Sequence, residues 1–592
     1  MQSHPAYRRH SSEPTISPLA QIHSSLQPRR QPLETLDQPE TLTWKQIRTV
    51  LISSVGFFTD AYDIFIMNLA VPMLGYVYFA NNNGKMPASI EGPLKGMVTF
   101  GSLIGQIMFG CIGDAYGRKM VYGVELIIIV VSTLFCATSA STVRGLSAIS
   151  FLFFWRFVLG VGIGGDYPMS ATITSEWAIR GRRGQMMAVV FSMQGIGNFV
   201  ASLVTVLLLL AFRGAIEADQ FNIDYVWRMC IGLGAVPSML TVYQRLVLPE
   251  TPRYAVDVLN DMELGEMAYQ SVRVPKKQWK KMQEKRGEQR QDQEKPQSQL
   301  TPREAGGEFR AEPEEEGGDD RKKRRASHRR CVLDHFGRWA NLRVLIGTAG
   351  TWFLLDVAFY GLSLNQAFVL NATGFAGGDD PWNDLFRQAV GNLIISVLGA
   401  IPGYITSVFL IERIGRKPIQ YIGFIMLAVI FLVLSIFFRQ IHNNTPALFV
   451  VLFAFLQFFF NFGPNTTTFV LPGEVFPTRL RATSHGISAA FGKLGAIVST
   501  FGFNSLVEHG GAPGQHAFLP QTLGIFAVVM LLGAALTPLI PETCGKDLDY
   551  FEKDHAREWE ELGWLREAGC IRLWRKIYPK LLRRGTAMKR QP

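Results

Sequence analysis

An acidic side chain lies in the middle of an apolar segment that is long enough to cross a membrane. The segment reads Thr351-Trp-Phe-Leu-Leu-Asp-Val-Ala-Phe-Tyr-Gly361, and Trp352, Asp356 and Tyr360 repeat every four residues. Such spacing places all three on one face of a helix. A charge at bilayer depth costs about 2.5 to 3.5 kcal/mol on insertion scales, so such residues face a cavity or a partner. The stripe predicts a binding site, and the alternative is an aromatic core face that includes an acid.

Two more carboxylates lie in the first apolar segment, where Phe58-Thr-Asp60-Ala-Tyr-Asp63 spaces the acids three residues apart. They therefore share one helix face. Two neighbouring carboxylates seldom both ionise at low dielectric, which makes the pair a candidate proton acceptor. The alternative is a pair exposed to water at the end of the helix.

The fourth apolar segment carries Arg156 and, after four glycines, Asp166-Tyr167-Pro168. Gly160, Gly162 and Gly165 match the dinucleotide pattern GxGxxG, but no strand precedes them, and glycines in membrane helices let neighbouring helices approach closely. Pro168 cannot donate to the carbonyl of Gly164 and disfavours helical geometry at Tyr167. We therefore expect a locally opened helix beside Asp166.

Three further polar residues lie deep in later segments. Gln194 belongs to the fifth, Asn465 to the tenth beside Pro464, and Lys493 to the eleventh, where it is the only lysine deep in a helix. A deep cation with several carboxylates, amides and phenols describes a site for an anion coupled to protons. Single Gln or Asn residues also hold helices together, so Gln194 and Asn465 fit either reading.

These residues need membrane-spanning helices to position them. The 592-residue chain is 48% hydrophobic, and twelve segments approach the roughly 20 apolar residues that a span requires. We predict an all-α integral membrane fold with six helices on each side of a polar linker. The expected parts are a disordered tail at 1–45, helices at 46–249, a largely disordered linker at 250–340, helices at 341–541 and a tail at 542–592.

Two loop patterns occur twice at an offset of 298 residues. Asp114 followed by Gly-Arg118-Lys is echoed by Glu412 followed by Gly-Arg416-Lys, and Glu176 is echoed by Glu474 (412 minus 114; 474 minus 176). One shared offset indicates a duplicated six-helix unit, the organisation of major facilitator transporters, which bind substrate between their halves. We interpret the six charged residues as a cytoplasmic gate whose salt bridges hold one alternating-access state.

Basic residues are distributed unevenly among the short loops. One side carries ten (Arg118, Lys119, Arg180, Arg182, Arg183, Arg413, Arg416, Lys417, Arg479 and Arg481) and the other four (Lys85, Arg144, Arg213 and Arg439). The positive-inside rule places the first set, both termini and the linker in the cytoplasm. The net charge of +11 and the basic run 321–325 therefore indicate contact with anionic lipid rather than nucleic acid. Ser327 beside that run is a candidate for kinase action.

The six cysteines show no disulfide or CxxC spacing, so we expect free thiols, no metal site and no cofactor. Residues 1–45 lack the apolar core of a signal peptide, so the first span would direct insertion. Twelve spans exclude a soluble enzyme. Glycosylation sequons begin at Asn371 and Asn443 in expected external loops, and a third, at Asn465, lies within a helix.

Together, Gly164-Gly-Asp-Tyr-Pro168, Phe58-Thr-Asp-Ala-Tyr-Asp63, Phe491-Gly-Lys493 and the Trp352 stripe closely resemble fungal phosphate:proton symporters of the major facilitator superfamily. The likeness covers about 45–260 and 335–555. It implies import of inorganic phosphate with protons across the plasma membrane. The implied phosphate site is Tyr167, Gln194, Trp352, Asp356, Tyr360 and Asn465 with Lys493, and the implied proton path is Asp60, Asp63 and Asp166 with Arg156.

Three other functions remain open at this stage. A carrier of organic phosphates such as glycerophosphodiesters would use a similar site. A phosphate sensor could signal through the linker or tail, although it would not need Asp60 or Asp63. A sugar:proton symporter shares the loop patterns and the Pro-Glu-Thr-Pro-Arg run at 249–253, but Lys493 near Asp356 suits an anion better.

Overall fold

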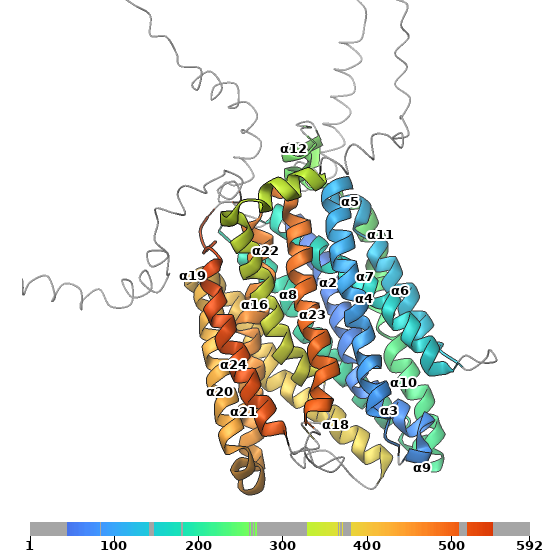
Figure 1. Cartoon of the computed structure of the whole chain (residues 1–592). Helices are drawn as coiled ribbons and strands as arrows, with labels where there is room; N and C mark the ends of the chain where they lie inside the picture. The colour runs from blue at the N-terminus through green and yellow to red at the C-terminus, as the bar shows by residue number, and fades with distance from the viewer. Residues whose placement is uncertain are drawn as a thin grey trace, which may run out of the picture.

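The computed structural model describes residues 44–82, 84–140, 147–178, 181–259, 328–364, 380–507 and 518–546, with a few single positions between and beyond them. Most of both expected tails and of the expected linker lies outside the described residues, as do Ser327, the Asn371 sequon, Arg144 and Arg180. The described ends of the linker are helical, with a short helix at Pro252–Asp257 and another over 328–336. The described part is an all-helical bundle without strands (Figure 1).

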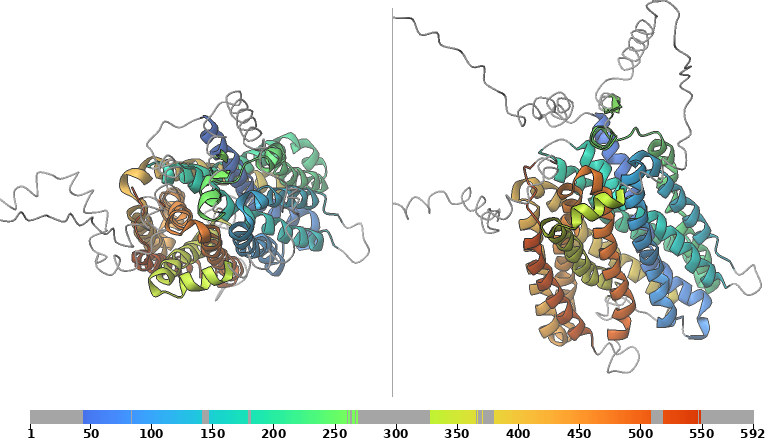
Figure 2. Two further views of the ribbon diagram at one scale, coloured as in Figure 1. Left: turned by 90° about the horizontal axis from the view of Figure 1, so that it is seen from above. Right: turned by 45° about the horizontal axis from the view of Figure 1, so that its top comes forward.

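The long helices of the first half of the chain run along the long axis of the bundle (Figure 1). Their bounds are α2 Trp44–Phe65, α3 Met67–Tyr78, α4 Ala88–Tyr116, α5 Arg118–Val121, α6 Val124–Ala137, α7 Ala148–Trp177, α8 Arg183–Ala211, α9 Arg213–Ala218, α10 Ile223–Gly232, α11 Ala235–Leu246 and α12 Pro252–Asp257. Figure 2, seen from above, shows these blue-to-green helices gathered on one side.

Helices of the second half gather on the other side, coloured yellow to red (Figure 2). Their bounds are α16 Trp339–Ser363, α18 Pro381–Ile395, α19 Ile401–Ile414, α20 Arg416–Asn444, α21 Pro446–Asn461, α22 Pro464–Val475, α23 Arg481–Val507 and α24 Leu519–Leu536. A π-helical segment, η3 Ser396–Ala400, joins α18 to α19.

Eleven helical stretches within the described residues are long and apolar enough to span a membrane. These stretches correspond to eleven of the twelve segments expected from the sequence. The twelfth expected segment is α23, which is long enough but more polar than the others. Its buried residues include Arg481, His485, Ser488 and Lys493. Because α23 packs between α4 of the first half and α16 of the second, its polar side chains face protein rather than lipid.

The sequence predicts an opened helix at Pro168, whereas the structure breaks the chain before Pro464 instead. At the tenth span, α21 ends at Asn461 and α22 begins at Pro464, with Gly463 out of the helical region (φ −171°, ψ −132°). At Pro168 the expectation of an opened helix is wrong, because α7 runs unbroken from Ala148 to Trp177. The glycine before Pro464 can leave the helical conformation freely, whereas Tyr167 before Pro168 stays in it.

The α5 end of the bundle is called the basic end here, because the turns containing Arg118, Arg183, Arg416 and Arg481 lie there. The opposite end, where α3, α9 and α18 meet (Figure 1), is called the far end. These two names fix the positions of the polar sites below.

Candidate functional site

Seven polar residues expected to bind the substrate meet at one buried place between the halves. Each of them is at most 4% exposed: Tyr167, Gln194, Trp352, Asp356, Tyr360, Asn465 and Lys493. They come from α7 and α8 of the first half and from α16, α22 and α23 of the second. We refer to them, with Tyr404, as the central site.

The charged centre of this site is Lys493. Its Nζ donates to the Tyr360 hydroxyl at 2.6 Å and lies 3.7 Å from Oδ2 of Asp356. It also lies over the Tyr360 ring, 4.4 Å from the centroid, and 5.0 Å from that of Tyr167. Oδ2 of Asp356 has no hydrogen-bond partner among the described residues. The acid and the lysine therefore attract each other while each keeps bonding capacity for a ligand.

The amides of the site are connected through a residue that the sequence analysis missed. Tyr404 in α19 donates its hydroxyl proton to Oε1 of Gln194 at 2.8 Å and accepts from Nδ2 of Asn465 at 3.0 Å. Gln194 in turn donates to the Tyr167 hydroxyl at 3.3 Å. A single tyrosine in an apolar span has no spacing pattern that would mark it, and only the crossing of α19 with α8 brings it here.

An aromatic layer closes the site towards the basic end. Phe57, Phe191 and Phe469 are at most 1% exposed, and their ring centroids lie 4.7 to 5.7 Å apart. Phe191 precedes Gln194 in α8, which begins at the basic end, and Phe469 follows Asn465 in α22, which ends there. His485 packs edge-on against both Phe469 and Trp352. The site is therefore separated from the basic end by tightly packed rings.

The candidate proton-path acids are buried in the first half. Asp60 is 1% exposed and neither of its carboxylate oxygens has a partner in the described structure. Asp63 accepts from the Thr133 hydroxyl at 2.9 Å, and its backbone carbonyl accepts from Arg156 at 2.7 Å. Arg156 thus holds the main chain of Asp63 rather than its carboxylate.

Asp166 has a partner that the sequence analysis also missed. Both of its oxygens accept from Arg245 in α11, at 2.9 and 3.0 Å, and the same guanidinium lies 3.3 Å from Glu125. A Cβ on Gly56 of α2 would collide with this ion pair. Arg245 lies at the very end of its span, where a basic residue is ordinarily assigned to the adjoining loop. Its role in the protein interior was therefore missed.

The six expected gate residues form one salt-bridge set in each half. In the first half Arg118 pairs with Asp114 at 3.0 Å and Glu176 at 3.1 Å. In the second, Arg416 pairs with Glu412 at 2.7 Å and Glu474 at 2.8 Å. Each set also includes the threonine of a Pro-Glu-Thr run, since Thr251 donates to Glu176 and Thr543 to Glu474. This third repeated pattern, at 249–251 and 541–543, was not recognised in the sequence.

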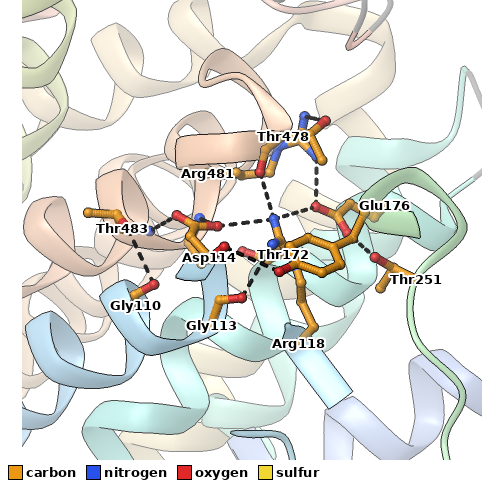
Figure 3. Close-up of polar contacts among 12 residues, drawn as sticks. Gly110, Gly113, Asp114, Arg118, Thr172, Glu176, Thr251, Thr478, Arg481 and Thr483 are labelled. Carbon is orange, nitrogen blue, oxygen red and sulfur yellow. Dashed lines mark hydrogen bonds and ion pairs between the residues drawn. The ribbon is translucent and has the colours of Figure 1, made fainter. Parts of the chain in front are cut away.

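The salt-bridge set of the first half also contacts residues of the second half (Figure 3). Arg118 donates to the backbone carbonyl of Thr478 at 2.6 Å, and Arg481 lies 3.1 Å from Glu176. Asp114 accepts from two backbone N–H groups at the start of α23, those of Ala482 and Thr483. A carboxylate at a helix N-terminus is favourably placed. The halves are thus held together at the basic end.

Comparison with known proteins agrees with this architecture. A profile of the "Sugar (and other) transporter" family matches residues 49–304 and 382–555, and so leaves out α16 with its Trp352 stripe. The inorganic phosphate transporter PHO84 of Saccharomyces cerevisiae is 40% identical over 550 residues, covering 90% of this chain and 88% of that protein. The repressible high-affinity phosphate permease of Neurospora crassa is 39% identical, covering 88% of each.

Among solved structures, the proton:xylose symporter XylE bound to 6-bromo-6-deoxy-D-glucose superposes with a TM-score of 0.61 at 18% identity, covering 86% of this chain and 98% of that one. At that identity the likeness concerns the fold, which is that of the major facilitator superfamily. The chain therefore belongs to the sugar (and other) transporter family and, within it, to the group that includes the fungal inorganic phosphate transporters.

Proposed function

We propose that the protein imports inorganic phosphate together with protons by alternating access. The observation that carries this proposal is the central site: a buried lysine and a buried carboxylate 3.7 Å apart, surrounded by phenol and amide groups from both halves. The names of the PHO84 and Neurospora relatives support the same substrate. We place the basic end and both termini in the cytoplasm, as the positive-inside rule predicts, and the protein in the plasma membrane.

Selectivity for phosphate follows from the acid in the site. Phosphate near neutral pH carries one or two protons, so a phosphate hydroxyl can donate to the free Oδ2 of Asp356. A fully ionised oxyanion such as sulfate would instead be repelled. Lys493 and the hydroxyls of Tyr167, Tyr360 and Tyr404 would donate to the remaining oxygens.

Coupling to protons follows from competition for Lys493. In the absence of substrate the lysine is attracted to Asp356. Bound phosphate draws on the same ammonium group, which makes protonation of nearby carboxylates easier. Asp60 and Asp63, with Asp166 beside them, then provide groups through which the proton can leave towards the basic end.

The moving bodies in this proposal are residues 46–249 and 341–541, joined by the linker 250–340. The salt bridges around Arg118, Glu176 and Arg481 hold the basic end closed, and their opening would release phosphate and protons. Kinase action at Ser327 is a proposed form of regulation.

The test is uptake of labelled phosphate into proteoliposomes with an imposed inward proton gradient. Asp356→Asn should abolish gradient-driven uptake, whereas Glu217→Gln, which alters a carboxylate that is 49% exposed near the far end, should not. Unlabelled sulfate and glycerophosphodiester should compete poorly.

Three outcomes would contradict the proposal. Normal uptake by the Asp356→Asn protein would remove the acid from the mechanism. Strong competition by glycerophosphodiester would identify an organic phosphate as the substrate. Phosphate binding by folded protein without any uptake would instead indicate a sensor.

A further inference from the structure

A line of polar side chains runs along one face of α18 into the first residue of η3, from the far end towards the central site. Asp384, Gln388, Asn392 and Ser396 are spaced four residues apart, so they share one face of the helix. Gln388 is 3% exposed, Asn392 2% and Ser396 1%, while Asp384 is partly buried. We call these four residues the α18 track.

The α18 track faces the opposite half of the protein. At its far-end side, the hydroxyl of Tyr76 in α3 donates to Asp384 at 3.0 Å. At its inner side, Asn198 in α8 donates to the Ser396 hydroxyl at 3.4 Å. Because both ends of the face contact the first half, Gln388 and Asn392 between them also lie along the boundary between the halves.

Several buried polar atoms of the α18 track make no hydrogen bond in the described structure. Both side-chain polar atoms of Asn392 lack a partner in the described structure, as do Oε1 of Gln388 and Oδ1 of Asp384. Leaving such buried groups unpaired costs about 1 to 3 kcal/mol each. A helix that served packing alone would carry apolar residues at these positions, so the polar groups indicate a ligand that visits the boundary.

The track leads directly to the central site. Ser396 is the first residue of the π-helical segment η3, after which the chain continues to Tyr404, which bonds to Gln194 and Asn465. Asn198, the partner of Ser396, lies one helical turn from Gln194 in α8. π-Helical segments are rare and occur frequently at functional sites.

We propose that the α18 track is a second phosphate-binding site, which receives phosphate at the far end and passes it to the central site when the halves part there. This inference rests on the proposed function. The amide of Asn392 would donate to a phosphate oxygen, and Oε1 of Gln388 and Oδ1 of Asp384 would accept from phosphate hydroxyls. The amide nitrogen of Gln388 already donates to Oδ2 of Asp384 at 2.9 Å. Arg213 lies beside the track, 4.4 Å from the Trp382 ring centroid, but it is paired with Glu217 at 2.8 Å and adds little net charge there.

The chemistry repeats that of the central site in a weaker form. Asp384, a tyrosine hydroxyl and two amides correspond to Asp356, its neighbouring phenols and Gln194 with Asn465, but no lysine of the described residues accompanies them. Without a buried cation the track should hold phosphate loosely, as a site that only captures and transfers its ligand must.

The test is phosphate uptake by intact cells that lack other phosphate carriers, with surface expression measured for each variant. Asn392→Leu and Gln388→Leu should each lower Vmax/KM about tenfold, the loss expected for one hydrogen bond to a charged ligand. Asn392→Asp, which keeps the size of the side chain but adds negative charge, should lower it further. Asn383→Leu removes an exposed amide on the same helix and should leave uptake unchanged.

Equilibrium binding of phosphate to the purified variants separates the track from the central site. We expect a Kd equal to that of the wild type, because the central site is intact. Unchanged Vmax/KM in both leucine variants overturns the inference, and so does a Kd that weakens in step with KM. If the wild type itself neither binds nor takes up phosphate, the proposed function fails and the track fails with it, whereas normal wild-type uptake with unaffected variants refutes the track alone.

Discussion

Replacing Lys493 by methionine should destabilise the protein, and a second substitution should restore it. The lysine and Asp356 are each at most 2% exposed and are 3.7 Å apart. Lys493→Met keeps the length of the side chain but leaves Asp356 without its cation. The double variant Lys493→Met/Asp356→Asn removes both charges and should recover most of the lost stability.

The geometry sets the size of the effect. Two unit charges about 4 Å apart attract by about 4 kcal/mol at an effective dielectric constant of about 20. Removing one partner of a buried pair costs about 3 to 5 kcal/mol. The 3.7 Å separation is too long for a hydrogen bond, and Lys493 bonds instead to Tyr360. We therefore expect Lys493→Met to lower the free energy of unfolding by about 3 kcal/mol, the lower end of that range.

The assay is thermal unfolding of the purified protein in nanodiscs, with and without phosphate. Phosphate at about one hundred times its Kd should stabilise the wild type by about 2.7 kcal/mol, and this gain should be absent in both variants. The matched control is Lys95→Met: Lys95 is 4% exposed, but its partner Glu91 is 30% exposed, so water can solvate the remaining acid.

The result that would refute this reasoning is a Lys493→Met protein as stable as the wild type that still responds to phosphate. A double variant less stable than the single one would also contradict it, because packing rather than charge would then account for the loss.

Three other substitutions test the remaining contacts. Tyr404→Phe keeps the ring but removes the hydroxyl that bonds Gln194, so KM for phosphate should rise by roughly fivefold; an unchanged KM would exclude the hydroxyl from binding. Arg481→Gln breaks the 3.1 Å contact with Glu176 across the halves, and cysteines placed at the basic end should then react faster with a maleimide; unaltered labelling would mean that this contact does not hold the end closed. Asp63→Asn should make uptake insensitive to the proton gradient, and retained sensitivity would remove Asp63 from the proton path.

Much of the site could be predicted from single residues, because a buried charge in an apolar segment is conspicuous in any sequence. Asp356, Lys493 and Asp60 were found in this way, and all are at most 2% exposed in the structure. Tyr404 and Arg245 could not be found, because a tyrosine within a span and an arginine at its end are ordinary. Their importance comes from their partners, which lie 210 and 79 residues away in the chain.

The sequence by itself determined the helices and the duplication, since the length of an apolar run and the spacing of repeated loops are local properties. Only the tertiary structure decided how the repeated charges connect: Arg118 and Arg416 each bind acids of their own half, while Arg481 alone of these arginines pairs with an acid of the other half within the described residues. It also decided that α7 continues through Pro168 while the chain breaks before Pro464. The physical reason is that such contacts depend on how helices cross, which no local pattern encodes.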